Sequence, residues 1–198
     1  CAGSADAGEL RAALTIEESR LEETINGLGV RCKGVNSGDE WLNGITVVVK
    51  AFDEHEEMAS RGLATMRGLA PGETCDLWMG LDGERSEFSS WTVDVTEVVP
   101  FRRQVEPEDV SVRSTSLQFQ NDVTPRVSAV IRNGRDEQLT QGVLAVPKLY
   151  DAAGVLLGST VELGPDLQPT EEARIDVRVH VPGHWLERVD DHSVVVSV

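Results

Sequence analysis

Residues 143–154 read VLAVPKLYDAAG, and residues 45–56 read ITVVVKAFDEHE. Both stretches begin with a mainly apolar run, and both contain an aromatic residue followed by an aspartate. The later stretch uses Tyr150, the only tyrosine of the chain, where the earlier one uses Phe52. A hydroxyl that one copy lacks does not explain the motif. We therefore interpret the aromatic–Asp pair as the end of a strand and the start of a turn.

The alignment that matches these two stretches continues on both sides of them. With the same offset of 98 residues, LAPGE at 69–73 falls over LQPTE at 167–171. With one residue less, Asn36 falls over Asn133. Three anchors in the same order, with a nearly constant offset, predict an internal repeat with one unit in each half of the chain.

Each half has the pattern of short strands separated by turns. Apolar and polar residues alternate at 127–132, 75–79 and 175–181, and Asn-Gly and Pro-Gly pairs separate the runs. Several such strands in about 90 residues predict an all-β fold of two tandem immunoglobulin-like β-sandwich domains. The expected boundaries are a tether at 1–9, a first sandwich at 10–99, a linker at 100–109 and a second sandwich at 110–198.

The segment 9–25 fits two structures. Its leucines lie near helical spacing, and Asn26-Gly27 would end a helix. The matching place in the second unit, VSVRSTSLQFQ at 110–120, alternates like a strand. The repeat therefore favours a first strand around Leu14 to Leu21, with the helix as the alternative.

The two units resemble the FxLYD domain family, a small immunoglobulin-like sandwich common in exported and lipid-anchored prokaryotic proteins. In the second unit, PKLYD at 147–151 occupies the naming motif, and Gly154 and Gly158 follow it. It departs from the family at Pro147, where phenylalanine is preferred. In the first unit, VKAFD at 49–53 is a looser match. The resemblance implies a fold and an extracellular location, and it implies no substrate.

Charge excludes some partners. The formal net charge is −16, so the chain has no overall basic character with which to neutralise nucleic acid or to dock on anionic lipid. Three lysines stand against fifteen arginines. This acidic, lysine-poor composition is typical of proteins from salt-loving archaea, and a GC-rich genome is the alternative explanation.

The sequence CAGSADAGE at 1–9 looks like the start of a mature lipoprotein, with a lipid on Cys1 and a short tether. The alternative is a chain trimmed at Cys1 without this meaning. No stretch has the 18 or so apolar residues that a membrane-spanning helix needs. We therefore expect a lipid anchor that holds the protein at the cell surface, outside the cell.

The remaining cysteines, Cys32 and Cys75, fall over Ala129 and Ala173 in the repeat. Both cysteines of one unit are thus alanines in the other, which indicates matched inward positions on neighbouring or facing strands. An even pair in an exported chain predicts a Cys32–Cys75 disulfide.

The sequence contains no catalytic motif, so we expect no enzyme and no cofactor. One titratable cluster lies near the end of the chain, at His180, His184, Asp190 and His192. A loop between two strands could bring these groups together around a metal ion, although a solvated acidic loop is the simpler interpretation.

Three tryptophans are candidates for a binding surface. Trp78 alternates with inward residues and should point outward, either toward the other domain or toward a partner. Trp41 and Trp185 lie near expected loops. The sequence predicts a non-enzymatic binding or spacer module with a possible protein partner at the cell surface. The alternative is a lipoprotein that binds a small solute or a metal, between its domains or at the terminal His/Asp cluster.

Overall fold

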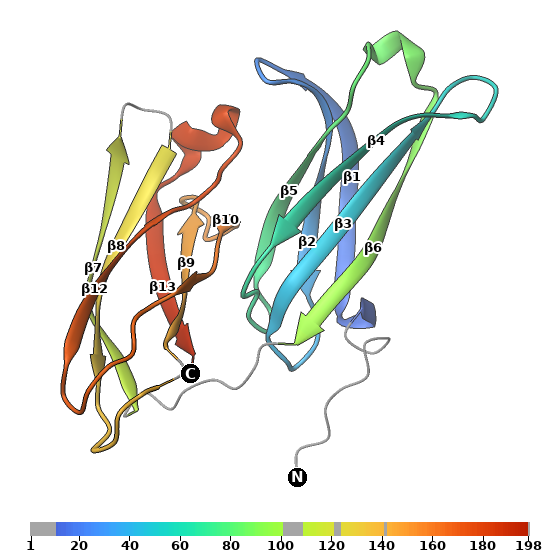
Figure 1. The fold of residues 1–198 in the computed structure, drawn as a ribbon. Coiled ribbons are helices and arrows are strands. Elements are labelled where there is room, and N and C mark those ends of the chain that lie inside the picture. The colour runs from blue at the N-terminus through green and yellow to red at the C-terminus, as the bar shows by residue number, and fades with distance from the viewer. Residues whose placement is uncertain (1–10, 101–108, 121–123, 141, 198) are drawn as a thin grey trace. The chain divides into compact units, whose positions relative to one another are not determined.

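The computed structural model describes residues 11–100, 109–120, 124–140 and 142–197 (Figure 1). The described residues are mostly β, with several antiparallel sheets and two short 3-10 helices. The chain divides into two compact units: the first runs to Pro100 and also includes Pro182–His184, and the second holds the rest. Within the described ranges, no helix is long and apolar enough to cross a membrane. Cys1 and most of the expected linker lie outside the described residues.

The first unit has six strands and one 3-10 helix. In chain order these are β1 (Leu14–Thr24), β2 (Gly27–Asn36), β3 (Leu42–Phe52), β4 (Met58–Met66), β5 (Thr74–Gly80), η1 (Arg85–Glu87) and β6 (Ser90–Pro100). Strand β2 pairs with β1 and β5, and β3 pairs with β4 and β6, always antiparallel. The unit therefore consists of two three-stranded sheets.

The second unit repeats this order with one strand divided. Its elements are β7 (Val110–Gln120), β8 (Thr124–Asn133), β9 (Leu144–Tyr150), β10 (Leu156–Ser159), β11 (Glu162–Leu163), β12 (Glu172–Arg178), η2 (Gly183–Arg188) and β13 (Asp191–Ser197). Strand β8 pairs with β7 and β12. Strand β9 pairs with β13, and it also pairs with β10 and β11, which occupy the place that β4 has in the first unit.

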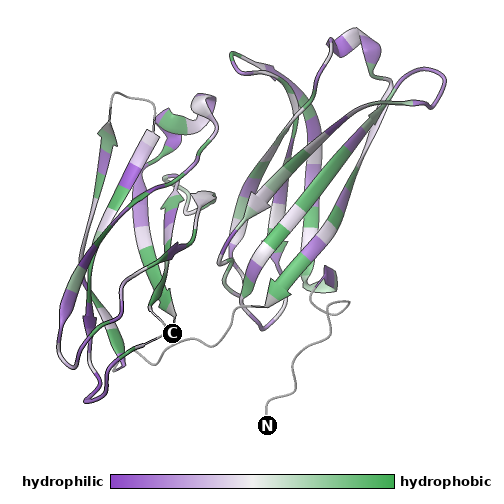
Figure 2. Cartoon of the chain, viewed as in Figure 1, coloured by the Kyte–Doolittle hydropathy of each residue, from purple (hydrophilic) through white to green (hydrophobic). Residues whose placement is uncertain are grey.

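The core of the second unit lies between its two sheets. It is formed by buried residues from β7, β8, β9, β12 and their connections: Val110, Ala129, Ile131, Leu139, Val143, Ala145, Leu167, Ile175 and Val177. Figure 2 shows the strands of both units banded in hydrophobic and hydrophilic colour, as expected when alternate side chains face the core and the solvent. Burial of this apolar surface is the main stabilising contribution.

The strand interpretation of segment 9–25 is confirmed from Leu14 onward, and the helix alternative is wrong there. Residues 11–13 are helical, and β1 then pairs with β2 from Leu14 to Thr24. Ile25, the apolar residue that ends the segment, is 90% exposed in the turn. Pairing along a whole strand outweighs the weak local preference for a helix.

The expected Cys32–Cys75 disulfide is wrong, because both cysteines are free thiols. They lie on the neighbouring strands β2 and β5 and are both buried, as the repeat indicated. In the register, however, Cys32 is opposite Leu77, and Cys75 is opposite Gly34. A diagonal pair of this kind is separated by roughly 7–8 Å. A disulfide requires a Cα separation of roughly 4.4–6.8 Å.

We predict that neither thiol reacts in the folded protein. Burial, with the charge of Asp76, raises the pKa of Cys32 to about 12, and burial likewise raises the pKa of Cys75. At neutral pH both thiols are protonated and shielded from reagents. Alkylation by iodoacetamide followed by peptide mapping should label Cys32 and Cys75 only after unfolding. Rapid labelling under native conditions, or an absence of label after unfolding without reductant, would contradict this assignment.

Each unit has one glycine where the edge of one sheet closes on the other. A Cβ on Gly62 of β4 would lie 2.3 Å from the backbone oxygen of Gly80, at the end of β5. A Cβ on Gly158 of β10 would lie 2.5 Å from the backbone oxygen of His180, just after β12. Only glycine allows the two backbones to come this close.

Candidate functional site

The two aspartates of the aromatic–Asp motif shape equivalent turns. In both units one carboxylate oxygen accepts hydrogen bonds from the backbone N–H groups two and four residues later. The distances are 2.8 and 2.9 Å for Asp53, and 3.0 Å for both bonds of Asp151. Backbone hydrogen bonds therefore already occupy one oxygen of each of these two carboxylates.

Two fully buried asparagines hold the next connection in each unit. The Asn36 amide donates to the backbone oxygens of Glu40 and Leu69, at 2.8 and 3.0 Å. Asn133 donates to Glu137 at 2.8 Å and to Leu167 at 3.2 Å, at the matching positions. In both units the side-chain oxygen accepts a backbone N–H from two residues later. The asparagines thus hydrogen-bond to backbone groups of the connections, outside the named strands.

The glutamates of the LAPGE and LQPTE stretches also act on the backbone. Glu73 accepts the N–H of Ala70 at 2.8 Å, and Glu171 accepts the N–H of Gln168 at 2.7 Å. The polar residues that the two halves share therefore hydrogen-bond to the backbone of turns and loops. None of these contacts indicates catalysis.

Asp151 makes one contact that Asp53 lacks. Its second oxygen accepts a hydrogen bond from Arg188 of η2 at 2.8 Å, and the Arg188 guanidinium lies 5.2 Å from the ring centroid of Trp185. Burial alone would raise the pKa of Asp151. The bonds from Arg188, Val155 and Ala153 and the charge of Arg188 outweigh burial and lower it. This carboxylate therefore ties η2 to the end of β9.

The lowered pKa of Asp151 predicts a loss of stability in acid. Because the folded-state pKa lies below the unfolded value, the stabilisation is present above the unfolded pKa and is lost as the pH falls through the folded one. Between about pH 5 and pH 2, Asp151→Asn should lose less stability than the wild type. Urea unfolding at pH 7 and pH 3 measures this difference. Equal losses for the two proteins would contradict it.

Tyr150 and Lys148 lie together on β9, on the face away from the core. The Tyr150 hydroxyl is 3.2 Å from the hydroxyl of Ser193, and the Lys148 ammonium is 5.7 Å from the Tyr150 ring centroid. Lys148 is only 1% exposed, whereas the matching Lys50 pairs with Asp94 at 3.0 Å and is partly exposed. The same lysine thus has two different environments in the two units.

The tryptophan candidates differ in exposure. Trp78 lies on β5, on the face away from the core, as predicted, and it is half-buried. Its ring covers Gly29 so closely that a Cβ there would lie 2.5 Å from it. Trp41 is half-buried between β2 and β3, and Trp185 is buried at 2% exposure in η2. Trp185 therefore offers no ring surface to a partner.

The terminal His/Asp candidates are not brought together. Within the described residues, no three His, Cys, Asp or Glu side chains form a group that could hold a metal ion. His180 follows β12, and His184 lies in η2. Asp190 lies just before β13, and His192 lies at its start. These four residues therefore lie on separate elements.

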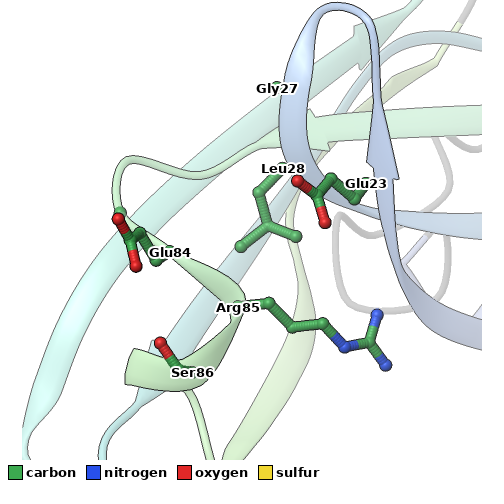
Figure 3. Close-up of a pocket in the computed structure, with 7 residues that line it drawn as sticks. Glu23, Gly27, Leu28, Glu84, Arg85 and Ser86 are labelled. Carbon is green, nitrogen blue, oxygen red and sulfur yellow. The ribbon is translucent and has the colours of Figure 1, made fainter.

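An open hollow of about 760 Å³ lies at the loop end of the first unit. Its walls come from the β1–β2 turn and from η1: Glu23, Gly27, Leu28, Gly83, Glu84, Arg85 and Ser86. Figure 3 shows Glu23, Leu28 and Arg85 directed into the same space, with Glu84 across from them. Small-molecule pockets are mostly apolar and enclosed. This hollow is polar and open, and sequence reasoning missed it because it depends on loop positions.

A second hollow of about 600 Å³ shares Ser86 with the first and continues to the β3–β4 turn at 53–57. The two hollows show that three connections meet at one end of the first unit (Figure 1). This end, which we name the acidic end, carries eight carboxylates: Glu23, Asp53, Glu54, Glu56, Glu57, Asp82, Glu84 and Glu87. Two basic residues, Arg85 and His55, lie among these carboxylates.

The second unit has a surface of opposite sign on the sheet formed by β7, β8 and β12. Its core-facing residues alternate with five arginines, which we name the arginine face: Arg113, Arg126, Arg132, Arg174 and Arg178. Two carboxylates, Glu172 and Asp176, lie on the same face. The net charge of the whole chain, −16, does not indicate this local basic surface. The sequence signal was the arginines at alternate positions of two adjacent strands.

Neither a comparison with protein-family models nor a comparison with curated proteins finds a match for this chain. The resemblance to the FxLYD family therefore rests on the residues quoted for it above.

Proposed function

We propose that this chain is a non-enzymatic protein of two immunoglobulin-like modules that acts as a spacer and presents a binding surface outside the cell. The observation that supports it is the shared use of polar residues. Asp53 and Asp151, Asn36 and Asn133, and Glu73 and Glu171 make the same backbone contacts in both units. A motif repeated for structural reasons leaves the rest of the surface free to differ between units.

The arrangement of two similar units suits a spacer. Each unit has its own strands and its own buried residues, so one unit can change its surface without altering the other. The extracellular location is the one implied by the FxLYD resemblance. Differences between the modules, such as the acidic end of one and the arginine face of the other, supply the binding surface.

Thermal unfolding with a panel of small solutes tests this proposal against the solute-binding alternative. A ligand at a hundred times its Kd stabilises by about 2.7 kcal/mol, which shifts the Tm of one unit by roughly 10 °C or more. We expect no such shift with divalent metals, sugars, amino acids or nucleotides at millimolar concentration. A reproducible shift with one ligand class, removed by a variant of that site, would overturn the proposal.

A further inference from the structure

The most unusual part of the arginine face is a pair of like charges at directly opposed positions of two strands. Arg126 on β8 is directly opposite Arg178 on β12. Like charges at opposed positions of a sheet destabilise it. The neighbour on β7 is Gln118, which is neutral. This row of the sheet therefore holds two positive charges without a carboxylate.

Among the described residues, no carboxylate forms an ion pair with these two arginines. The Arg126 Nε is buried there without a hydrogen-bond partner. The carboxylate that acts on Arg126 is Asp176, which already bonds Ser128 and Arg174. Two adjacent guanidinium groups with free donors form a site for an anionic oxygen group such as a carboxylate.

The chain itself carries a matching surface on its other unit. Up to Pro100 it has nineteen carboxylates against eight lysines and arginines. In the β3–β4 turn, the exposed residues 54–57 are Glu, His, Glu and Glu, whereas the matching turn 152–155 is Ala, Ala, Gly and Val. Glu56 has a φ of 62°, where Gly154 has 76°. The second unit forms the same turn without these charges. The first unit nevertheless has a glutamate at a position that favours glycine.

We propose that the arginine face binds the acidic end of a second copy of this chain, with carboxylates of the β3–β4 turn seated on Arg126 and Arg178. Charge complementarity between the two surfaces selects this occupant. The two surfaces differ and lie on different units, so the contact is head to tail and generates open chains of molecules. The proposal rests on the proposed spacer function and names its partner.

Sedimentation equilibrium of the full chain tests this self-association. In 0.15 M salt the weight-average mass should rise above 21.5 kDa with concentration. In 1 M salt the rise should shrink, because the screening length falls from about 8 Å to about 3 Å. The double variant R126E/R178E should weaken association about tenfold or more. R61E, which makes the same kind of charge change at an exposed arginine of β4, should not.

A charge exchange between the two surfaces gives the sharpest result. E54K/E57K and R126E/R178E should each associate weakly alone, and a mixture of the two should recover association. Near-ultraviolet circular dichroism checks that each variant is folded, and R126Q/R178Q replaces the reversal if R126E/R178E is not. A wild type that stays monomeric at millimolar concentration would overturn the proposal, as would association that both arginine variants leave unchanged.

Two further outcomes separate this inference from the proposed function. Arginine-dependent binding of a sulfated glycan by a monomeric wild type would overturn the self-association and keep the binding module. A Tm shift with a small solute would overturn the proposed function. The sedimentation result would then decide by itself whether the head-to-tail contact forms.

Discussion

Replacing Gly62 by alanine is expected to destabilise the first unit by about 3 kcal/mol or more. The added Cβ would lie 2.3 Å from the backbone oxygen of Gly80, a distance that no side-chain rotation relieves. Strand β4 must therefore move away from β5, which opens one edge of the unit. For a unit of this size the Tm should fall by roughly 12 °C or more.

Tryptophan fluorescence during thermal or urea unfolding measures this effect in the first unit. That unit holds Trp41, Trp78 and Trp91, and the second holds only Trp185. Gly80→Ala is the matched control, because it adds the same methyl group on the other side of the same contact. Its Cβ would have nothing closer than 4.0 Å. Equal stability of G62A and G80A would show that the close approach is not a constraint.

The Asn133→Ala variant should lose about 2–4 kcal/mol of unfolding free energy in the second unit. Asn133 is fully buried, and its amide donates to three backbone oxygens, those of Glu137, Leu167 and Gln168. Each lost hydrogen bond costs about 0.5–1.5 kcal/mol, and the Leu167 and Gln168 oxygens keep backbone donors from Leu139 and Glu171. Asn133→Asp keeps the acceptor for Arg135 but loses the donors, so it should be at least as damaging.

The control for this prediction lies in the same loop. Gln138 is exposed, so Gln138→Ala should change stability by about 0.5 kcal/mol or less. Hydrogen exchange followed by mass spectrometry assigns the loss to the second unit. If N133A and Q138A unfold alike, the asparagine does not hold the loop.

The strands and the turns could be predicted from the sequence because their signals are local. Alternation at 127–132 and 175–181 marks β8 and β12, and the aromatic–Asp pairs mark the ends of β3 and β9. The first strand was chosen over a helix only by comparison with the second unit. Local leucine spacing could not decide it, because pairing with β2 determines the conformation.

The disulfide and the charged surfaces could not be predicted, because they depend on register and on loop positions. The repeat indicated that Cys32 and Cys75 are both inward, but it does not show which residues are opposite each other. The register places Cys75 opposite Gly34 and so separates the thiols. The same register places Arg126 opposite Arg178, which total net charge could not reveal.

The central claim is that the aromatic–Asp motif is structural in both units, and hydrogen exchange tests it most directly. The amides to follow are those of residues 55 and 57 in Asp53→Ala, and those of 153 and 155 in Asp151→Ala. We predict that each variant exchanges about tenfold faster at its own turn, with the other turn unchanged. Unchanged exchange at both turns would contradict the claim and leave the two carboxylates available for chemistry.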